Sequence, residues 1–287
     1  MDKISDLERK IILLALDEDE VLHDVTTNAL SVYDSNVSAV VVSKEVGIIS
    51  GTGTFISVFS IVDPAVDIRA LIRDGSAVKK GDIVLEISGP KSSILKGERT
   101  ALNFLQRLSG IATLTKRYTD KLRNSGITLL DTRKTTPGMR YLEKKAVVDG
   151  GGRNHRMNLK EMAMIKDNHI RMAGSISKAV DMIRKNSPGI KIEVEVTGMN
   201  ELKEALEKNV DIIMLDNFDT ALIDSAVKLK KPGIKYEISG NVTMETITAR
   251  LRPGIDYISS GALTHSFRSL DLSLEISEGP SGSKTNE

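Results

Sequence analysis

Residues 191–216 read KIEVEVTGMNELKEALEKNVDIIMLD and hold the pattern from which the architecture of this chain can be worked out. Residues 191–196 alternate apolar and polar side chains, as in a β-strand, and residues 199–209 place apolar side chains at helical spacing. Residues 211–216 form a second strand-like run. A strand, a helix and a strand joined by short connections predict two parallel strands covered by a helix.

The same alternation extends in both directions from this stretch. We expect strands at 127–131, 161–166, 191–196, 211–216, 235–239 and 256–260, and helices at 175–186, 199–209, 218–231 and 243–251. Alternation over this length predicts an α/β fold with a parallel sheet and helices outside it, most simply a barrel of the TIM kind.

The residues before this region follow a different pattern. Short β-like runs at 38–43, 46–59, 67–72 and 82–89 are separated by Gly and Asp, which is typical of an antiparallel, half-buried sheet. A long helix is then expected from Ser93 to Asn124. The last residues of the chain have the composition of a flexible tail, which we place at 278–287.

The composition of the chain is that of a globular enzyme. With 287 residues, of which 40% are apolar and 28% charged, it can form one large α/β domain or two domains. The absence of cysteine excludes disulfides, thiolate metal sites and a cysteine nucleophile, and it fits a reducing, intracellular setting. The N-terminal apolar run from Ile11 to Leu16 is too short for a signal peptide or a membrane span. A net charge of +1, no Trp and 3% aromatic residues argue against a dedicated nucleic-acid binder.

Positive charge is concentrated between Asp131 and Arg171. This segment carries ten Lys and Arg against five Asp and Glu, an excess of five in a chain whose net charge is +1. Such an excess is expected where a polyanionic ligand is held. A solvated basic helix face is the alternative, but these positive residues fall in several different elements.

Polar residues stand at the end of nearly every expected strand of the parallel sheet. The chemistry of such a barrel collects at the C-terminal strand ends, which here carry Asp131 with Arg133 and Lys134, then Lys166, Glu195, Asp216, Ser239 and Ser260. Glu193 and Glu195 are two apart, so both should point into the barrel, where they need cationic partners or a ligand. Lys134, Lys166 and the arginines are the available partners. The alternative is an internal ion-pair network that binds no substrate.

Two glycine-containing tripeptides follow late strands of the sheet. Ser239-Gly240-Asn241 and Ser260-Gly261-Ala262 each precede a helical pattern, the place where barrel enzymes bind phosphate groups through backbone N–H groups. The chain contains no P-loop sequence and no strand-borne GxGxxG.

The glycines at 150–152 have a different expected role. They follow a helix-like segment at 139–148, so we expect them to end that helix and to let Asn154-His155-Arg156 approach the site. His155 and His169 lack partners at metal-ligand spacing, so a zinc site is not expected.

Several motifs of this chain closely resemble those of the quinolinate phosphoribosyltransferase family, also called nicotinate-nucleotide pyrophosphorylase (carboxylating). The matching segments, in the family's order and spacing, are HDVTT (23–27), ERTALNFLQRLSGIAT (98–113), DTRKTTPG (131–138), GGGRNHR (150–156), IKDNH (165–169), EVEV (193–196), LDNF (215–218), ISGN (238–241) and SSGALTHS (259–266). The resemblance runs from about residue 10 to residue 276. Asn241 stands where many members have a second Gly.

The resemblance implies a fold and an activity. It implies an N-terminal α/β sandwich at 1–110, with 268–280 packing back on it, and an open, seven-stranded, TIM-like α/β barrel at 111–267. The family is a pentosyltransferase of NAD biosynthesis. It joins quinolinate to phosphoribosyl pyrophosphate (PRPP) with Mg²⁺ as cofactor and releases nicotinate mononucleotide, pyrophosphate and CO₂. A cytoplasmic homodimer with shared active sites is implied, while assembly beyond the dimer is left open.

The resemblance also assigns roles to individual residues. Quinolinate carboxylates and phosphates would be held by Thr132, Arg133, Lys134, His155, Arg156 and Lys166, with Arg99 contributed by the partner subunit. Glu195 and Asp216 would face the ribose hydroxyls and Mg²⁺. The phosphate of PRPP would lie against Ser239, Gly240, Asn241, Ser260, Gly261 and Ala262. Lys134, Lys166, Glu195 and Asp216 would be the catalytic residues, without a covalent intermediate.

Three other functions remain open from the sequence. A paralogue linked to molybdate transport, or a phosphoribosyltransferase for another pyridine or base, would share the fold and the phosphate sites. A Schiff-base aldolase could use Lys166 or Lys134, which borohydride trapping would reveal. A non-catalytic anion-binding or RNA-binding module would show salt-dependent binding without turnover.

Overall fold

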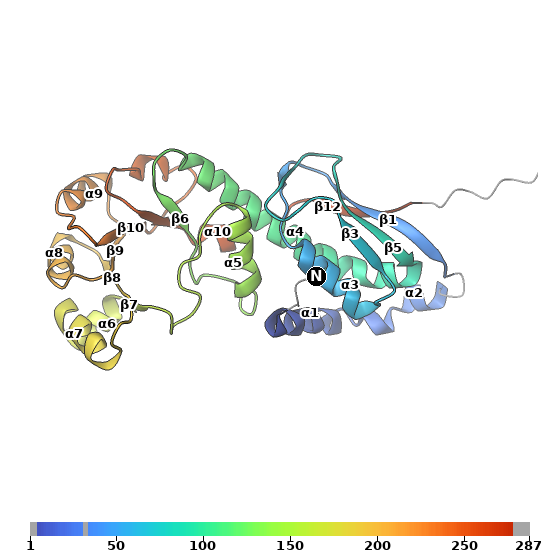
Figure 1. Cartoon of the computed structure of the whole chain (residues 1–287), viewed down its shortest axis with the longest axis horizontal. Coiled ribbons are helices and arrows are strands. Elements are labelled where there is room, and N and C mark those ends of the chain that lie inside the picture. Colours follow the sequence, from blue (N-terminus) through green and yellow to red (C-terminus); the bar gives the residue numbers. More distant parts are fainter. Residues whose placement is uncertain (1–4, 31–33, 278–287) are drawn as a thin grey trace, which may run out of the picture. The chain divides into compact units, whose positions relative to one another are not determined.

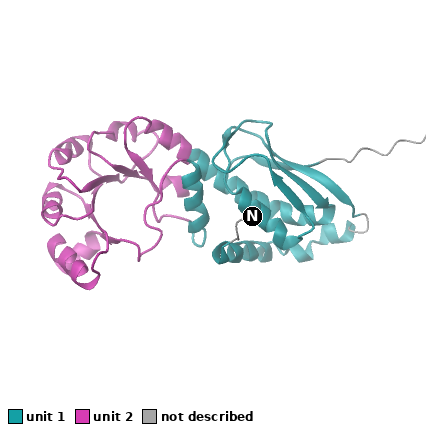
Figure 2. Ribbon diagram, viewed as in Figure 1, with its two compact units in different colours: residues 1–114, 137–150, 267–287 teal, residues 115–136, 151–266 magenta. Residues whose placement is uncertain are grey.

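The structure, a computed structural model, describes residues 5–30 and 34–277, so the tail expected at 278–287 lies outside the described residues. The chain divides into two compact units, coloured separately in Figure 2. Unit 1 comprises 1–114, 137–150 and 267–287, and unit 2 comprises 115–136 and 151–266. No helix of the described part combines the length and apolar character needed to cross a membrane.

Unit 1 contains a helix layer and an antiparallel sheet (Figure 1). Its elements are α1 (Asp6–Glu18), η1 (Val21–His23), α2 (Val25–Leu30), β1 (Asn36–Ser43), β2 (Gly47–Ile48), α3 (Thr52–Val62), β3 (Asp67–Ala70), β4 (Ala77–Val78), β5 (Ile83–Pro90), the first part of α4 (Lys91–Lys121), α5 (Arg140–Asp149) and β12 (Leu272–Ser277). The main sheet has the order β12-β1-β5-β3, and β2 pairs with β4. The last strand of the described chain, β12, therefore returns to pair with the first, β1.

The segment 137–150 groups with unit 1, whereas the sequence analysis placed it within the barrel. Its helix α5 makes polar contacts with other parts of unit 1. The buried Glu143 accepts a hydrogen bond from Arg107 of α4 at 2.6 Å, and Lys145 contacts Asp74 at 2.7 Å. These contacts explain the grouping because a buried carboxylate is stable only beside such a partner.

The β-like run expected at 46–59 is wrong over its second half, which forms α3. The buried side chains Phe55, Val58 and Phe59 recur at helical spacing, and Asp74 accepts hydrogen bonds from the backbone and hydroxyl of Thr52 at the helix start. The segment is rich in Thr, Val, Ile and Phe, which favour strands when local propensity alone is considered. Burial on one helical face overrides that propensity here.

Unit 2 contains a six-stranded parallel sheet that curves into an open ring (Figure 1). Its strands are β6 (Thr128–Leu130), β7 (Ala163–Ile165), β8 (Ile192–Val196), β9 (Ile212–Asp216), β10 (Lys235–Ser239) and β11 (Tyr257–Ser259), in the order β6-β11-β10-β9-β8-β7. All six expected strands are found and the α/β, barrel-like class is confirmed. Where the resemblance implies seven strands, Arg153 makes only a single parallel bridge to Leu130 of β6.

Helices lie outside this sheet in Figure 1. They are α6 (Asp167–Ala173), α7 (Ile176–Asn186), α8 (Met199–Glu207), α9 (Thr220–Val227), η3 (Thr248–Arg250) and α10 (Ala262–His265). The helices expected at 175–186, 199–209 and 218–231 are confirmed as α7, α8 and α9. Ser175 and Asp219 cap α7 and α9 by accepting hydrogen bonds from the backbone of the first turn.

The helix expected at 243–251 is wrong, since only η3 forms there. The hydroxyl of Thr243 accepts hydrogen bonds from the backbone of Glu245 and Thr246, and the hydroxyl of Thr246 accepts one from the backbone of Thr243. Threonine side chains can replace helical hydrogen bonds in this way, which favours a turn. The apolar periodicity of the segment is therefore present without the helix.

Candidate active site

The strands of unit 2 place polar residues around a cavity of about 570 Å³ at their C-terminal ends. On β8, Ile192, Val194 and Val196 are buried on one face, while Glu193 and Glu195 point into the barrel, as expected from their spacing. The expected site residues that line this cavity are Thr132, Arg133, Lys134, His155, Arg156, Lys166, Glu195, Asp216, Ser239, Gly240 and Asn241.

The order of the strands arranges these side chains by chemistry. Two carboxylates, Glu195 and Asp216, come from the neighbouring strands β8 and β9, and the Ser239-Gly240-Asn241 turn lies at the end of β10. Cationic side chains follow the two edge strands, with Lys166 after β7 and Arg133 after β6. The cavity therefore offers separate cationic, carboxylate and backbone-turn surfaces.

Lys166 and Glu195 form an ion pair in the cavity. Lys166 Nζ lies 2.6 Å from Glu195 Oε2. Burial, and next the negative charge of Glu195, raise the pKa of Asp216 above its ordinary value. Two carboxylates that repel one another in this way would be stabilised by a cation between them.

Arg133 and Arg156 present two guanidinium groups to the cavity. Arg156 donates from Nη1 to the carbonyl of Met162 at 2.8 Å, which fixes one end of its planar group. The Nε atoms of both arginines are buried, and neither has a hydrogen-bond partner within the described part of the chain. Burial, followed by the charge of Arg133, lowers the pKa of Arg156. Each guanidinium is thus suited to an anionic oxygen that the protein does not itself supply.

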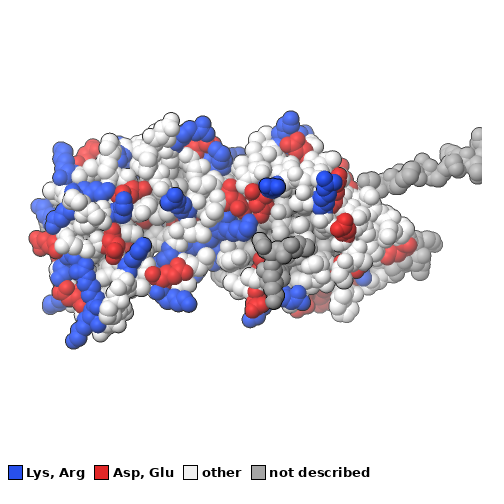
Figure 3. Space-filling model, in the orientation of Figure 1, with Lys and Arg blue, Asp and Glu red and all other residues white. Residues whose placement is uncertain are grey.

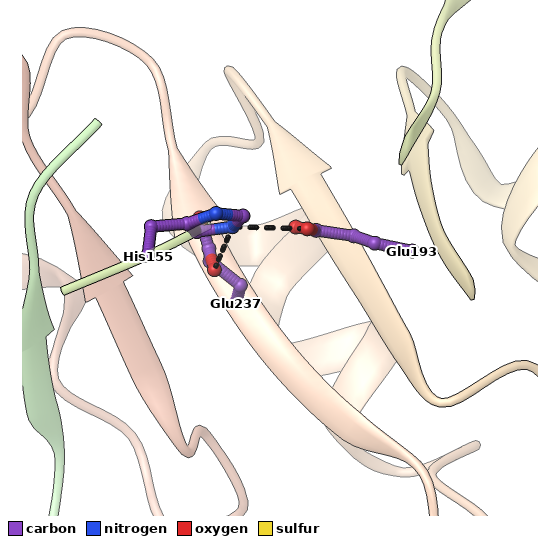
Figure 4. A group of neighbouring side chains, drawn as sticks. All are labelled: His155, Glu193 and Glu237. Carbon is purple, nitrogen blue, oxygen red and sulfur yellow. Dashed lines mark ion pairs between the residues drawn. The ribbon is translucent and has the colours of Figure 1, made fainter. Parts of the chain in front are cut away.

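His155, Glu193 and Glu237 form a cluster with little or no solvent exposure (Figure 4). His155 Nε2 lies 2.9 Å from Glu193 and 3.5 Å from Glu237, and both carboxylates have no solvent exposure. Its Nδ1 accepts the backbone N–H of Arg156 at 2.8 Å. Both ring nitrogens are therefore engaged by the protein, so His155 lines the cavity without directing a free donor into it.

The cluster binds a proton more tightly than its separate groups would. Burial alone would lower the pKa of His155, but its contacts with Glu193 and Glu237 raise it to about 10. Burial, and next the charge of Glu237, raise the pKa of Glu193. Both shifts favour a proton held between His155 and Glu193. The charge of Glu193 also acts on Arg156 in the direction opposite to the charge of Arg133.

The same three residues have the spacing of a metal site, since their ligand atoms lie within 4.8 Å of one another. A metal would need the lone pair of His155 Nε2, with the proton on Nδ1. Nδ1 instead accepts the Arg156 N–H, which places the proton on Nε2. The arrangement fits a shared proton better than a metal ion.

The turn after β10 is held by three side-chain hydrogen bonds. Arg250 Nη1 donates to the backbone carbonyl of Gly240 at 2.5 Å. The hydroxyl of Thr246 donates to the backbone carbonyl of Asn241 at 2.9 Å. The hydroxyl of Ser260 donates to the backbone carbonyl of Val242, also at 2.9 Å. These hydrogen bonds restrain the conformation of the turn in the absence of a ligand. This favours anion binding by its backbone N–H groups.

Ser260, Gly261 and Ala262 do not line the cavity. The hydroxyl of Ser260 is used by the turn after β10, and Ser259, one residue earlier, faces the cavity with a buried Oγ that has no partner among the described residues. Gly261 allows a close approach instead, because a Cβ there would lie 2.9 Å from Lys134 Cδ.

Arg99 is an exposed residue of α4 in unit 1, where it lines a different hollow together with Asp24 and Lys96. Cavity residues that the sequence analysis did not assign to the site are Asp131, Met164, Met214, Asn217, Glu237 and Ser259. Asp131 and Ser259 stand at strand ends, and Glu237 is two residues from Ser239 on the same strand face, which was a signal for these three. Nothing in the sequence distinguishes Met164 or Met214.

The basic segment from Asp131 to Arg171 does not form a single solvated helix face. Arg133, Arg156 and Lys166 line the cavity, whereas Lys145 pairs with carboxylates of unit 1. Figure 3 shows Lys and Arg interspersed with Asp and Glu over the face that it draws. The local excess of positive charge is thus directed partly into the cavity.

Comparison with known proteins assigns both parts of the chain. Residues 24–109 match the family profile "Quinolinate phosphoribosyl transferase, N-terminal domain", and residues 111–275 match "Quinolinate phosphoribosyl transferase, C-terminal domain". A probable nicotinate-nucleotide pyrophosphorylase [carboxylating] of Synechocystis sp. is 44% identical over 239 residues, which cover 82% of this chain and 81% of the relative.

Solved structures agree with this assignment. NadC from Streptococcus pyogenes has a TM-score of 0.91 at 41% identity, with 97% of this chain and 100% of that chain covered. The nicotinate-nucleotide pyrophosphorylase from Francisella tularensis has a TM-score of 0.92 at 38% identity, with 96% and 98% covered. The matching motifs, the cavity that gathers them and these similarities show that the chain belongs to the quinolinate phosphoribosyltransferase family.

Proposed function

We propose that the cavity of unit 2 carries out the family's reaction, in which quinolinate and PRPP give nicotinate mononucleotide, pyrophosphate and CO₂. The observation that carries this proposal is the arrangement of three surfaces around one cavity: cations after β6 and β7, Glu195 and Asp216 on β8 and β9, and a hydrogen-bonded turn at the end of β10. A dianionic pyridine, a ribose and a phosphate need surfaces of these three kinds.

The quinolinate carboxylates bind to the arginine side of the cavity. Arg133 and Arg156 each have a buried Nε without a protein partner, and the planar guanidinium group matches a carboxylate in a bidentate way. Lys134 and Lys166 add point charges that also suit phosphate oxygens. His155 acts through Arg156, because its ring accepts the Arg156 N–H and its other nitrogen contacts Glu193.

The ribose lies near Glu195 and Asp216, and the turn at 239–241 accepts the 5′-phosphate through its backbone. Glu195 and Asp216 would also hold Mg²⁺ together with oxygens of PRPP, which fits the raised pKa of Asp216 and the preference of Mg²⁺ for carboxylate oxygens. When bound, Mg²⁺ supplies positive charge that stabilises the departing pyrophosphate.

The chemistry needs alignment and charge rather than a protein nucleophile. The ring nitrogen of quinolinate attacks C1 of the ribose as the bond to pyrophosphate breaks. The resulting pyridinium withdraws electrons from the adjacent ring carbon, so the carboxylate at that carbon leaves as CO₂ and a proton takes its place. The residues of this chain hold both substrates in line and balance their charges.

We also propose that two copies of the chain share their active sites, with Arg99 of one copy completing the cavity of the other. Arg99 is exposed on α4, and large exposed apolar side chains lie on the neighbouring elements, namely Leu14 of α1, Leu22 of η1 and Val25 of α2. Val25 lines the same hollow as Arg99, and burial of such exposed apolar side chains would favour the pairing of two copies.

The test is a turnover assay with PRPP, Mg²⁺ and quinolinate, in which both CO₂ and nicotinate mononucleotide are measured. Both products should form in equal amounts, and a chelator should stop the reaction. A phosphoribosyltransferase for another base would leave quinolinate unchanged and release no CO₂. A protein that binds PRPP but turns over no pyridine would contradict the proposal.

A further inference from the structure

A chain of hydrogen bonds connects the carboxylate end of the cavity with its turn. The side-chain amide of Asn241 donates from Nδ2 to Asn217 Oδ1 at 3.1 Å. Asn217 in turn donates from its own Nδ2 to Asp216 Oδ2 at 2.9 Å. The orientation of the Asn217 amide is fixed by this chain, because turning it over would place two donors together at one end and two acceptors at the other.

The backbone shows that Asn217 is fitted to this position. Its φ is 55°, in the left-handed region that Asn and Gly tolerate best, and its N–H donates to the carbonyl of Ser239 at 3.1 Å. The side chain lies directly against Gly240, since a Cβ on Gly240 would be 2.2 Å from Asn217 Oδ1. The end of β9 and the turn after β10 are already neighbours in the sheet, and Asn217 adds a side-chain connection between them.

We propose that Asn217 is a positioning residue that holds the Asp216 carboxylate and the Gly240-Asn241 turn in a fixed relative position. A phosphorylated ribose could then bind to both at once. The inference rests on the proposed function, which places the ribose at Asp216 and the phosphate at the turn. Both hydrogen bonds are exposed to solvent, so we expect them to contribute little to the stability of the fold.

The connection predicts which ligand is affected. PRPP would contact both ends of the hydrogen-bond chain, so its binding depends on their relative position. Quinolinate binds at Arg133 and Arg156, which are not members of the chain. Loss of Asn217 should therefore weaken PRPP binding and leave quinolinate binding unchanged.

The variants follow from the backbone. Asn217→Gly and Asn241→Gly keep the left-handed conformation, since φ is also positive at Asn241 (49°), and each removes its side-chain hydrogen bonds. Asn217→Asp keeps the size and the acceptor for Asn241 but sets a negative charge against Asp216. Asn209→Gly is the matched control, because Asn209 has a φ of 47° and lies before β9, away from the cavity.

The experiment measures dissociation constants by calorimetry on the full chain, for PRPP with Mg²⁺ and separately for quinolinate. We expect each glycine variant to weaken PRPP binding by about three- to tenfold, because either variant breaks the connection between Asp216 and the turn, and losing that connection should cost about as much as one hydrogen bond. The double variant should match Asn217→Gly to within about twofold, because Asn241 acts through Asn217. Asn217→Asp should lose more than Asn217→Gly, and Asn209→Gly should behave as wild type.

Several results would overturn the inference. PRPP binding that is unchanged in Asn217→Gly would do so, as would a double variant whose loss is the product of the two single losses. A parallel loss of quinolinate binding would make Asn217 a general structural residue. If the wild type turns over quinolinate and Asn217→Gly binds PRPP normally, the inference is wrong but the proposed function stands. If the wild type binds no PRPP, both the inference and the proposed function are wrong.

Discussion

Replacing Arg156 with alanine should weaken quinolinate binding by about 1.5–3 kcal/mol, the contribution of a hydrogen bond to a charged group. This corresponds to a dissociation constant about 10- to 150-fold higher, at 1.4 kcal/mol for each factor of ten. The structure supports a value within this range because Arg156 Nε is buried without a partner among the described residues, while Nη1 already donates to Met162. Arg156→Lys should fall between wild type and alanine, since it keeps the charge and loses the planar group.

The assay is calorimetric titration of quinolinate into wild type, Arg156→Ala and Arg153→Ala. Arg153 is the matched control because it is exposed, lies three residues away and does not line the cavity. Its loss should change the affinity by less than about twofold, through long-range charge alone. A melting temperature near that of wild type would show that Arg156→Ala is folded. Equal losses in the two variants, or none in either, would refute the direct contact.

Three further predictions concern substrate choice, assembly and stability. Turnover of nicotinate should be lower than that of quinolinate by orders of magnitude, because one carboxylate leaves cationic groups unpaired, and comparable rates would contradict the two-carboxylate site. Mixing inactive Arg99→Ala with inactive Lys134→Ala should restore about a quarter of wild-type activity after subunit exchange, because random pairing leaves one intact site in each mixed dimer. If subunits exchange without recovery, Arg99 acts within its own chain. Burial would raise the pKa of Asp256, but the hydrogen bonds that it accepts from Lys230 and Lys235 outweigh burial and lower that pKa. The ionised carboxylate therefore stabilises the fold fully above the unfolded-state pKa of about 3.9. This contribution to stability is lost as the pH falls through the folded-state pKa. At pH 7, Asp256→Asn should lower the free energy of unfolding by about 1–2 kcal/mol relative to wild type, and this difference should narrow below about pH 4. Asp224→Asn, at an exposed ion pair, should change the free energy of unfolding little. A difference between Asp256→Asn and wild type that does not depend on pH would contradict the assignment.

Local pattern was sufficient to place the parallel sheet. Its strands are short apolar runs that end in polar residues, and two-residue periodicity alone put Glu193 and Glu195 on the inner face of β8. The same approach failed at α3 and at 243–251. At α3, β-branched and aromatic side chains indicated a strand, but burial on one helical face decided for a helix. At 243–251, apolar periodicity indicated a helix, but hydrogen bonds to the hydroxyls of Thr243 and Thr246 decided for a turn.

The functional chemistry was visible in the sequence because it depends on residue type at strand ends, and strand ends of a parallel sheet meet at one edge. The sequence by itself thus determined the sheet, the family and most of the residues around the cavity. Only the tertiary structure decided that Ser259 rather than Ser260 faces the cavity, that His155 is turned towards Glu193 and Glu237, and that Asn217 joins Asp216 to Asn241. These outcomes depend on the direction of individual side chains and on contacts between segments far apart in the chain, which no local periodicity specifies.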